Sequence, residues 1–511
     1  MSMFADREAV ANNIVAAFDA FTPEEQNVVL RQILLKCQLR FVYAELKTLL
    51  AVDFVAHLPR ELTERIFSYL DGVEMSRAAC VSRLWREKTN NEGLWQRLCK
   101  LKRWEHFGFN EDLSREESCS SPTSTSRTSP RFTPVNSDVI SLSPLCHWKD
   151  VYIRAHHLNK NWATGKYTVM PALRGHEGRV NCMDCDGKLL VSGGGDNSVR
   201  LWDLATGKCI NQLEGHTDSV TGIELRNNIV VTSCADSVIR VFEASSGRCL
   251  KVMQGHTSGV EHLCFDGANL VSASNDRTVR VWSLSSGKCI HNLTGHTDDI
   301  QLLCMHGDLA VSSSWDQTLR LWDIRRGLCL QILVGHAEVV YCCQFDERRI
   351  VSGGADSFVK IWNPQTGECT KTLSGHTGEV YCLKYNEDVI ASGAADSIVR
   401  LWSFAGECLH ELREHIGVVR CLLQEGDRLI SGGDQKKVVI WNTKEGKLLN
   451  VVHRNPTLLH LMWANETKLV LASPESPGTV SILSYWHPAL DKVRAPQQGT
   501  AAPRYGPQRA R

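Results

Sequence analysis

The sequence lacks an excess of either charge and lacks long hydrophobic runs. Lys plus Arg and Asp plus Glu each number 57 among 511 residues, so composition gives no reason to expect nucleic acid or a membrane as partner. No stretch reaches the roughly 18 consecutive apolar residues of a membrane helix, and the stretch MSMFADREAVANNIVAAFDAF lacks the basic start and apolar core of a signal peptide. We therefore expect a soluble intracellular protein, in the cytoplasm, the nucleus or both, with two or three domains.

The chain also lacks a C-x-x-C pair with a matching second pair, although it has 20 cysteines. The sequence therefore predicts no metal site, and nothing in it calls for a cofactor. Six cysteines follow a Gly-x pair at nearly constant spacing, namely Cys209, Cys249, Cys289, Cys329, Cys369 and Cys408. A regular position within an apolar segment suits a small buried hydrophobe, so we expect reduced thiols in the core.

What the sequence does contain is an internal repeat. Gly-His recurs with a step of 40 residues, at 175–176, 215–216, 255–256, 295–296, 335–336 and 375–376. Tryptophans keep the same step at 202, 282, 322, 362 and 402, with Phe242 in the missing slot and Trp441 one residue short. Short β-rich runs joined by Gly, Asp and Asn turns lie between these markers, and each period predicts four short strands.

Each repeat carries a serine, a histidine and an aspartate, the residue types of a hydrolase triad. The sets are His176/Ser192/Asp196/Trp202, His256/Ser272/Asp276/Trp282, His296/Ser312/Asp316/Trp322, His336/Ser352/Asp356/Trp362 and His376/Ser392/Asp396/Trp402. An enzyme places one reactive serine in one cleft and does not repeat it five times. The step of about 40, with Gly-His opening and Trp-Asp closing, resembles the WD-repeat family of β-propellers. The resemblance implies that the four residues hydrogen-bond one another and lock a blade, so we expect no catalytic residue.

Eight runs equivalent to SVRLW, the last being the weak TVSIL at 479–483, predict a mainly β fold with an eight-bladed propeller at residues 166–485. The entering segment KYTVMPALRGH (166–176) matches the outer strand and loop of later repeats. Such a strand would complete the final blade and leave no open edge. The seventh repeat has Glu414 for glycine and Asp434 one residue early, and the eighth lacks both Asp and Trp. Seven blades with a loose tail is the alternative.

Residues 53–104 contain three short apolar sets. Leu58, Leu62, Ile66 and Leu70 fall at four-residue steps on one expected helix started by Pro59, followed by the sets Val81/Leu84/Trp85 and Leu94/Trp95/Leu98. So few residues bury little surface alone, which predicts a partner. The leucine-proline opening, IFSYLD, ACVSRLW and LWQRL resemble an F-box. The resemblance implies docking onto the Skp adaptor, and through it onto cullin and RING subunits of a ubiquitin ligase, with adaptor contacts at Leu58, Pro59, Leu62, Ile66, Leu84 and Trp85.

The remaining segments surround these two parts. The spacing of apolar residues within 1–52 predicts helices, which a capping box supports. These helices form either an ordinary packed hairpin or a segment for homodimerisation. Residues 105–146 form a Ser/Pro-rich linker that cannot bury a core and is expected to be disordered. Its phosphorylation candidates each precede a proline, and these are Ser121, Ser129, Thr133 and Ser143. Residues 147–165 resemble the helical connector of F-box/WD-repeat receptors, and 486–511 form a basic tail that we expect to be disordered.

Two repeat positions should point to the central channel of a propeller, the residue five after each histidine and the residues flanking each turn aspartate. The first set is Asn181, Thr221, Glu261, Gln301, Tyr341, Tyr381 and Arg420, and the second includes Asn275, Arg277, Trp315 and Lys436. In F-box/WD-repeat receptors these positions often hold arginines and tyrosines that grip a phosphorylated degron. The resemblance therefore implies substrate contacts at Arg277, Gln301, Trp315, Tyr341, Tyr381 and Arg420.

Gln301 and Trp315 depart from that pattern, because related phosphate-reading receptors tend to carry arginine there. The substrate is then less dependent on phosphate, or the phosphate lies on another blade; ordinary loop surface is the plain alternative. We interpret the chain as a non-enzymatic substrate-recognition subunit of a Skp–cullin–F-box ubiquitin ligase that binds a protein degron. A scaffold that assembles another multiprotein complex is the rival, and a propeller hydrolase would need unpaired polar residues lining the channel.

Overall fold

The computed structural model describes residues 55, 58–105, 107, 146–434, 437–452, 459, 461–473 and 475–486. They divide after Ala155 into a helical unit and a propeller unit, each described by itself. Within these ranges, no helix is both long and apolar enough to cross a membrane. The predictions for segment 1–52, the four phosphorylation candidates, Lys436 and the tail beyond residue 486 lie outside the described residues.

The helical unit contains four short helices and the first part of a longer one. They are α5 (Arg60–Phe67), α6 (Gly72–Ala78), α7 (Arg83–Thr89), α8 (Glu92–Leu101) and α10 (His147–Thr164). Polar side chains cap three of their starts. Asp71 accepts from the backbone N–H groups of Val73 and Glu74, and Glu74 accepts from that of Asp71, which makes a reciprocal capping box. Ser82 and Asn91 cap α7 and α8 more simply, each by accepting one backbone N–H, from Trp85 and from Gly93.

The helix α5 is shorter than the four-residue pattern predicted. Pro59 has an extended backbone, with φ −51° and ψ 150°, and is the N-cap rather than a helical residue. Leu58 therefore precedes the helix, and Leu70 follows its C-cap Ser68. The face that packs inward carries Thr63 and Phe67, 1% exposed each. The expected apolar stripe is thus not the core face of α5.

A buried tryptophan anchors the core of the helical unit. Trp95 is fully buried, and its indole N–H donates to the carbonyl of Thr89 at 2.7 Å. Its ring centroid lies 5.2 Å from that of Tyr152 on α10, and Lys149 places its ammonium 5.4 Å from the same ring. A buried aromatic residue contributes both apolar area and ring contacts, so Trp95 holds α8 against the first part of α10.

The propeller unit has eight blades, each an antiparallel sheet in meander order. The strands of blades 1 to 4 are, in chain order, β3 (Val180–Cys185), β4 (Leu189–Gly194), β5 (Val199–Asp203) and β6 (Lys208–Leu213); β7 (Val220–Arg226), β8 (Ile229–Cys234), β9 (Ile239–Glu243) and β10 (Cys249–Met253); β11 (Val260–Phe265), β12 (Leu270–Ser274), β13 (Val279–Trp282) and β14 (Cys289–Leu293); β15 (Ile300–His306), β16 (Leu309–Ser314), β17 (Thr318–Asp323) and β18 (Leu328–Val334). Those of blades 5 to 7 are β19 (Val340–Phe345), β20 (Ile350–Gly354), β21 (Val359–Trp362) and β22 (Cys369–Leu373); β23 (Val380–Tyr385), β24 (Ile390–Ala394), β25 (Val399–Trp402) and β26 (Cys408–Leu412); β27 (Val419–Glu425), β28 (Arg428–Gly433), β29 (Val438–Asn442) and β30 (Lys447–Val452).

Blade 8 is built from both ends of the repeat region, as the sequence predicted. Its inner strands are β31 (Leu461–Ala464), β32 (Lys468–Ala472) and β33 (Thr479–Ser484). The outer position is filled by β1 (Thr168–Val169) and β2 (Leu173–Arg174), which both pair antiparallel with β33. Pro171 separates these two short strands because a proline has no N–H to give to a ladder. The ring is therefore closed with eight blades, and the seven-bladed alternative is wrong.

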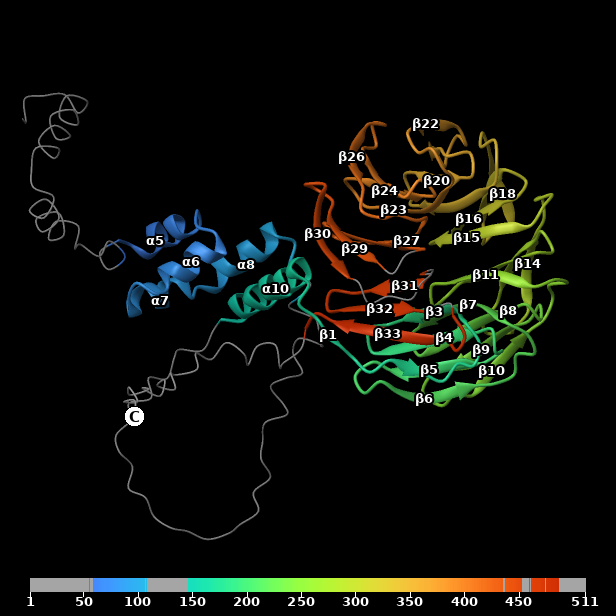
Figure 1. The fold of residues 1–511 in the computed structure, drawn as a ribbon, viewed down its shortest axis with the longest axis horizontal. Helices are drawn as coiled ribbons and strands as arrows, with labels where there is room; N and C mark the ends of the chain where they lie inside the picture. The colour runs from blue at the N-terminus through green and yellow to red at the C-terminus, as the bar shows by residue number, and fades with distance from the viewer. Residues whose placement is uncertain are drawn as a thin grey trace, which may run out of the picture. The chain divides into compact units, whose positions relative to one another are not determined.

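The innermost strands β3, β7, β11, β15, β19, β23, β27 and β31 neighbour one another in turn, and β31 returns to β3. Figure 1 shows this closure, with the red strand β33 beside β1 and the red strands β31 and β32 beside the green strand β3. One buried cluster joins the first and last blades through Leu173, Trp202, Val470, Val480 and Ile482, all at most 2% exposed. The core of the propeller is thus continuous between blade 1 and blade 8.

The second part of α10 packs within the propeller unit. The Trp162 ring stacks on that of Tyr485 at 3.5 Å and 14°, and the Arg428 guanidinium lies 4.3 Å from the Trp162 ring. The indole N–H donates to the carbonyl of Glu466 at 2.7 Å, and Asn161 donates to that of Tyr485 at 3.0 Å. These contacts hold the connector to blades 7 and 8.

The cysteines that follow each Gly-x pair are not in the core, so that prediction is wrong. Cys209, Cys249, Cys329, Cys369 and Cys408 are exposed and Cys289 is half-buried, all as free thiols on outer strands. Each pairs with the tryptophan or phenylalanine position across a register shift. The extra residue of such a bulge interrupts the inward–outward alternation. The buried cysteines lie elsewhere, with Cys182, Cys342 and Cys382 on inner strands.

We expect the ring closure to depend on β2. Replacing Leu173, which is 1% exposed and lies opposite Val480, in the substitution Leu173→Ala should lower the free energy of unfolding by about 2–5 kcal/mol, since it removes buried methyl groups and leaves a cavity. Val169→Ala in β1, where the side chain is 45% exposed, should cost much less. Thermal unfolding of both variants checks this, and equal melting temperatures would contradict a structural role for β2.

Candidate functional site

The repeated serine, histidine and aspartate form a hydrogen-bonded lock in each of five blades. In blade 5, the Ser352 hydroxyl lies 2.8 Å from Nε2 of His336 and accepts the Trp362 indole N–H at 2.8 Å. Nδ1 of His336 lies 2.8 Å from Asp356. The same contacts recur in blades 1, 3, 4 and 6.

This arrangement leaves no reactive group at the serine. Ser352 is fully buried, and its oxygen already bonds two partners. In blade 6, burial lowers the pKa of His376 although the Asp396 carboxylate opposes that effect. A triad is recognised by a nucleophile open to substrate, whereas these serines hold strands together. The tetrads are structural.

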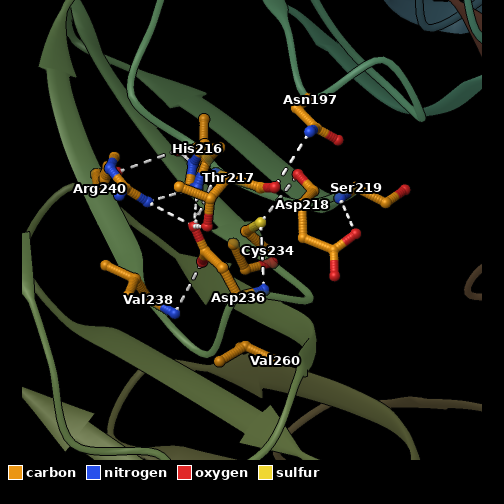
Figure 2. Close-up of polar contacts among 12 residues, drawn as sticks. Asn197, His216, Thr217, Asp218, Ser219, Cys234, Asp236, Val238, Arg240 and Val260 are labelled. Carbon is orange, nitrogen blue, oxygen red and sulfur yellow. Dashed lines mark hydrogen bonds and ion pairs between the residues drawn. The ribbon is translucent and has the colours of Figure 1, made fainter.

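Blade 2 lacks the tryptophan and contains a cluster with metal-ligand residue types (Figure 2). His216, Cys234 and Asp236 place one ligand atom each within 4.8 Å of one another. An Arg240 nitrogen, however, lies 2.6 Å from Nδ1 of His216 and 3.0 Å from Asp236, where a cation would sit. The Cys234 thiol is also occupied, because it bonds the carbonyl of Asp218 at 3.1 Å and the N–H of Asp236 at 3.3 Å. The cluster therefore serves as the lock of blade 2, with arginine as its cation.

Blade 7 lacks the turn aspartate of the lock. His415 and Trp441 still bond Ser431, at 2.8 Å each. Burial, and after it the positive charge of Lys437, lowers the pKa of His415 to about 4. The sequence suggested that Asp434 is a lock aspartate displaced by one residue, but it takes no part in the lock. Its carboxylate instead accepts two hydrogen bonds from the guanidinium of Arg420, at 2.5 and 3.1 Å.

We define the channel mouth as the second residue of the innermost strand of blades 1 to 7, together with the residue that precedes the turn position of the lock aspartate in the same blade. Its innermost members are the seven predicted residues Asn181, Thr221, Glu261, Gln301, Tyr341, Tyr381 and Arg420, all half-buried. On blades 1 and 2 these side chains bond the next blade. Asn181 donates to Ser219 and to the carbonyl of Val220, and Thr221 donates to the carbonyl of Val260. These two members are structural.

On blades 3 and 4 the two mouth positions of one blade bond each other. Asn275 donates to Glu261 at 3.0 Å, and the Trp315 indole N–H donates to the side-chain carbonyl of Gln301 at 2.8 Å. Trp315 nevertheless stays 51% exposed, an unusual state for so large an aromatic side chain. Arg277, from the turn of blade 3, is also exposed and has a left-handed backbone with φ 66°.

On blades 5 to 7 the mouth forms one aromatic and charged stack. The rings of Tyr341 and Tyr381 lie 5.0 Å apart and within 18° of parallel, and the guanidinium of Arg420 lies 5.2 Å from the Tyr381 ring. Alanines at 355 and 395 occupy the second mouth position of blades 5 and 6. The structure thus brings Tyr341, Tyr381 and Arg420 together, pairs Gln301 with Trp315, and leaves Arg277 on the turn of blade 3.

Acidic groups surround the tyrosine pair. The hydroxyl of Tyr381 donates to Glu379 at 2.6 Å, and this bond raises the pKa of Tyr381 to about 12. Burial, and then the charges of Glu379 and Glu338, raise the pKa of Tyr341. Asp434, Glu338 and Glu379 were not among the predicted site residues. Glu338 and Glu379 lie three and two residues before Tyr341 and Tyr381, and Asp434 directly precedes the turn position of blade 7. This nearness in sequence to the predicted residues could have indicated them.

The helical unit carries the second candidate surface. Leu62 and Ile66 lie on one face of α5, 48% and 40% exposed, with Tyr69 78% exposed just beyond the helix. Pro59 is exposed, and Leu58, Leu84 and Trp85 are half-buried. The Trp85 ring lies 5.6 Å from the ring of Phe67, which faces the core. The exposed apolar residues of α5 thus form a face that the described residues do not cover, as expected for a binding surface.

Comparison with known proteins identifies the class as β-propeller repeat proteins. The model of the family "WD domain, G-beta repeat" matches residues 167–203, 207–243, 247–283, 287–323, 327–363, 367–403 and 406–442. The chain belongs to this WD-repeat family. The F-box-like family model matches residues 55–101. The matched ranges include β1 and β2 of the eighth blade and leave out its strands β31, β32 and β33.

Two similar curated proteins are named as ubiquitin ligase subunits. The chain is 29% identical over 226 residues to "Probable E3 ubiquitin ligase complex SCF subunit sconB" of Arthroderma otae, covering 41% of this chain and 31% of that protein. It is 25% identical over 258 residues to the SCF subunit scon-2 of Neurospora crassa, covering 41% and 39%. The chain therefore spans about a third of the length of these relatives.

A solved structure resembles the propeller. The crystal structure of the computationally designed Ika8 protein matches with a TM-score of 0.58 and 27% identity, covering 61% of this chain and 98% of that protein.

The lock of blade 7 predicts a pH effect on stability. Because folding lowers the pKa of His415 from 6.5 to about 4, the unfolded chain binds the proton more readily. The stabilising contribution is complete above about pH 6.5 and is lost as the pH falls to about 4, by about 3 kcal/mol.

In the His415→Gln variant, the melting temperature of the propeller should therefore fall less steeply between pH 6.5 and pH 4 than in the wild type. Thermal unfolding of both proteins across this range measures the two slopes. Equal slopes would contradict the assignment.

Proposed function

We propose that this protein is the substrate-recognition subunit of a Skp–cullin–F-box E3 ubiquitin ligase. The observation that carries the proposal is the combination in one chain of an F-box-like helical unit and a closed WD-repeat propeller. The exposed face of α5 at Leu62 and Ile66 suits docking onto the Skp adaptor, which would link the chain to cullin and RING subunits. The names of the relatives sconB and scon-2 support the same assignment.

In this function the protein performs no bond chemistry. Its serine, histidine and aspartate sets are accounted for by the blade locks. It would act by proximity, because a substrate lysine held near the charged conjugating enzyme reacts as if at a high effective concentration. The channel mouth, with its cluster of exposed and half-buried polar and aromatic side chains, is the surface where we place the degron. We further propose a place of action in the cytoplasm or nucleus.

Gel filtration with purified Skp adaptor tests the proposal. We expect the wild-type chain to co-elute with the adaptor, and the double variant Leu62→Asp/Ile66→Asp to elute separately, since two charges on the α5 face would be desolvated by docking. Both side chains are at least 40% exposed, so the helical unit should keep its fold, which circular dichroism checks.

A matched control places the same change elsewhere. Ile210→Asp/Ile290→Asp alters two side chains on outer strands of the propeller that are 47% and 55% exposed, and this variant should co-elute like the wild type. Failure of the folded wild type to bind the adaptor would overturn the ligase function and favour a scaffold that assembles another complex.

A further inference from the structure

The charges around the tyrosine stack are unfavourable for a phosphate group. Arg420, the arginine of the tyrosine stack, already forms a two-point ion pair with Asp434. The two guanidinium nitrogens in that pair are therefore not available to a phosphate. Carboxylates lie on both blades of the tyrosine pair, Glu338 on blade 5 and Glu379 on blade 6. Blade 3 adds Glu261, which accepts from Asn275. A phosphorylated residue carries almost two negative charges and is repelled by neighbouring carboxylates.

The stack has one aromatic face left at its end. Arg420, Tyr381 and Tyr341 follow one another on blades 7, 6 and 5. Tyr381 contacts both Arg420 and Tyr341, whereas Tyr341 has a ring contact with Tyr381 alone among the described residues. The neighbour of blade 5 on the other side is blade 4, because β15 adjoins β19. Blade 4 presents Trp315, held by Gln301 and 51% exposed. Among the described residues, no ring or cation contact joins Tyr341 to Trp315.

The chain itself shows which group suits such a face. The guanidinium of Arg420 lies over Tyr381, and the quadrupole of an aromatic ring attracts a cation placed over it. The outer face of Tyr341 offers the same surface, with the Glu338 and Glu379 charges close enough to raise the pKa of the Tyr341 hydroxyl. Trp is the strongest aromatic partner for a cation. The exposed ring of Trp315 is therefore the second aromatic surface that a cation at this place could contact.

We infer that the channel mouth between blades 4 and 5 binds a basic side chain of the substrate, an arginine or a lysine, between Tyr341 and Trp315 and beside Glu338. The inference rests on the proposed function only in taking the substrate to be a protein segment at this mouth. It names a degron that is read through positive charge and not through phosphate.

Peptide selection by the full chain, bound to the Skp adaptor, tests the inference. The probes are degenerate peptide libraries whose central residue is arginine, lysine, alanine, phosphoserine or phosphothreonine. We expect the arginine and lysine libraries to be retained above the alanine library, and the phosphorylated libraries to be retained less than alanine. The Tyr341→Ala variant should lose about two- to thirty-fold of the basic preference, the range of one cation–π contact.

Two further variants separate binding from folding. Glu338→Gln changes one exposed side chain at the mouth and should also weaken the basic preference, whereas Glu347→Gln, at the opposite end of β19 in an exposed turn, should leave it unchanged. Retention of phosphorylated libraries above alanine, or a basic preference that survives both mouth variants, would overturn the inference. So would the absence of any selection by a wild-type chain that co-elutes with the adaptor, a result that leaves the ligase function standing.

Discussion

The pairing of β1 and β2 with β33 is the constraint on which the propeller depends. A sheet that ends in an unpaired strand exposes a row of N–H and C=O groups, and a ring has no such edge. Here the pairing also completes a core, because Leu173 enters the cluster shared by blades 1 and 8. Blade 8 has neither the lock aspartate nor the tryptophan of the other blades. The pairing with β1 and β2 therefore stabilises this blade in place of a lock. The channel mouth exists because the innermost strands are held in this closed ring.

The blade locks explain why polar residues of catalytic type fill a protein to which we assign no catalysis. One serine hydroxyl joins a histidine from a loop to a tryptophan from another strand, and the carboxylate behind the histidine fixes the turn. Where a blade departs from this set, another contact replaces it. Arg240 bridges His216 and Asp236 in blade 2, and blade 7 keeps only the serine, histidine and tryptophan. Asp434 of blade 7 takes no part in a lock and lies at the mouth, where it pairs with Arg420.

The number of blades, the closing strand and the blade locks could be predicted from the sequence because each depends on spacing, which a 40-residue repeat displays directly. It is harder to predict from the sequence on which side of a strand a residue lies. The regular spacing of the six cysteines predicts burial, but a bulge beside the tryptophan shifts the alternation by one residue and exposes them. The spacing alone does not reveal that shift. The four-residue steps predict a helix that includes Leu58 and Leu70, whereas α5 lies between Pro59 and Ser68. The stack of Tyr341 on Tyr381 depends on a contact between blades, which a single repeat does not contain. The ion pair of Arg420 with Asp434 lies within blade 7 and depends on two side chains that the other repeats do not carry at these positions.

Closure by the first strand also fixes the order in which the protein can fold during synthesis. Thr168 pairs with Ser484, so residues made early must wait for almost the last residues of the ring. Contacts between residues so far apart in the chain form slowly, because the intervening loop must first be ordered. Until β33 is made, β1 and β2 have no partner, and the forming sheets keep edges that can pair with other chains. The ribosome-bound protein is therefore exposed to misassembly until β33 has been made.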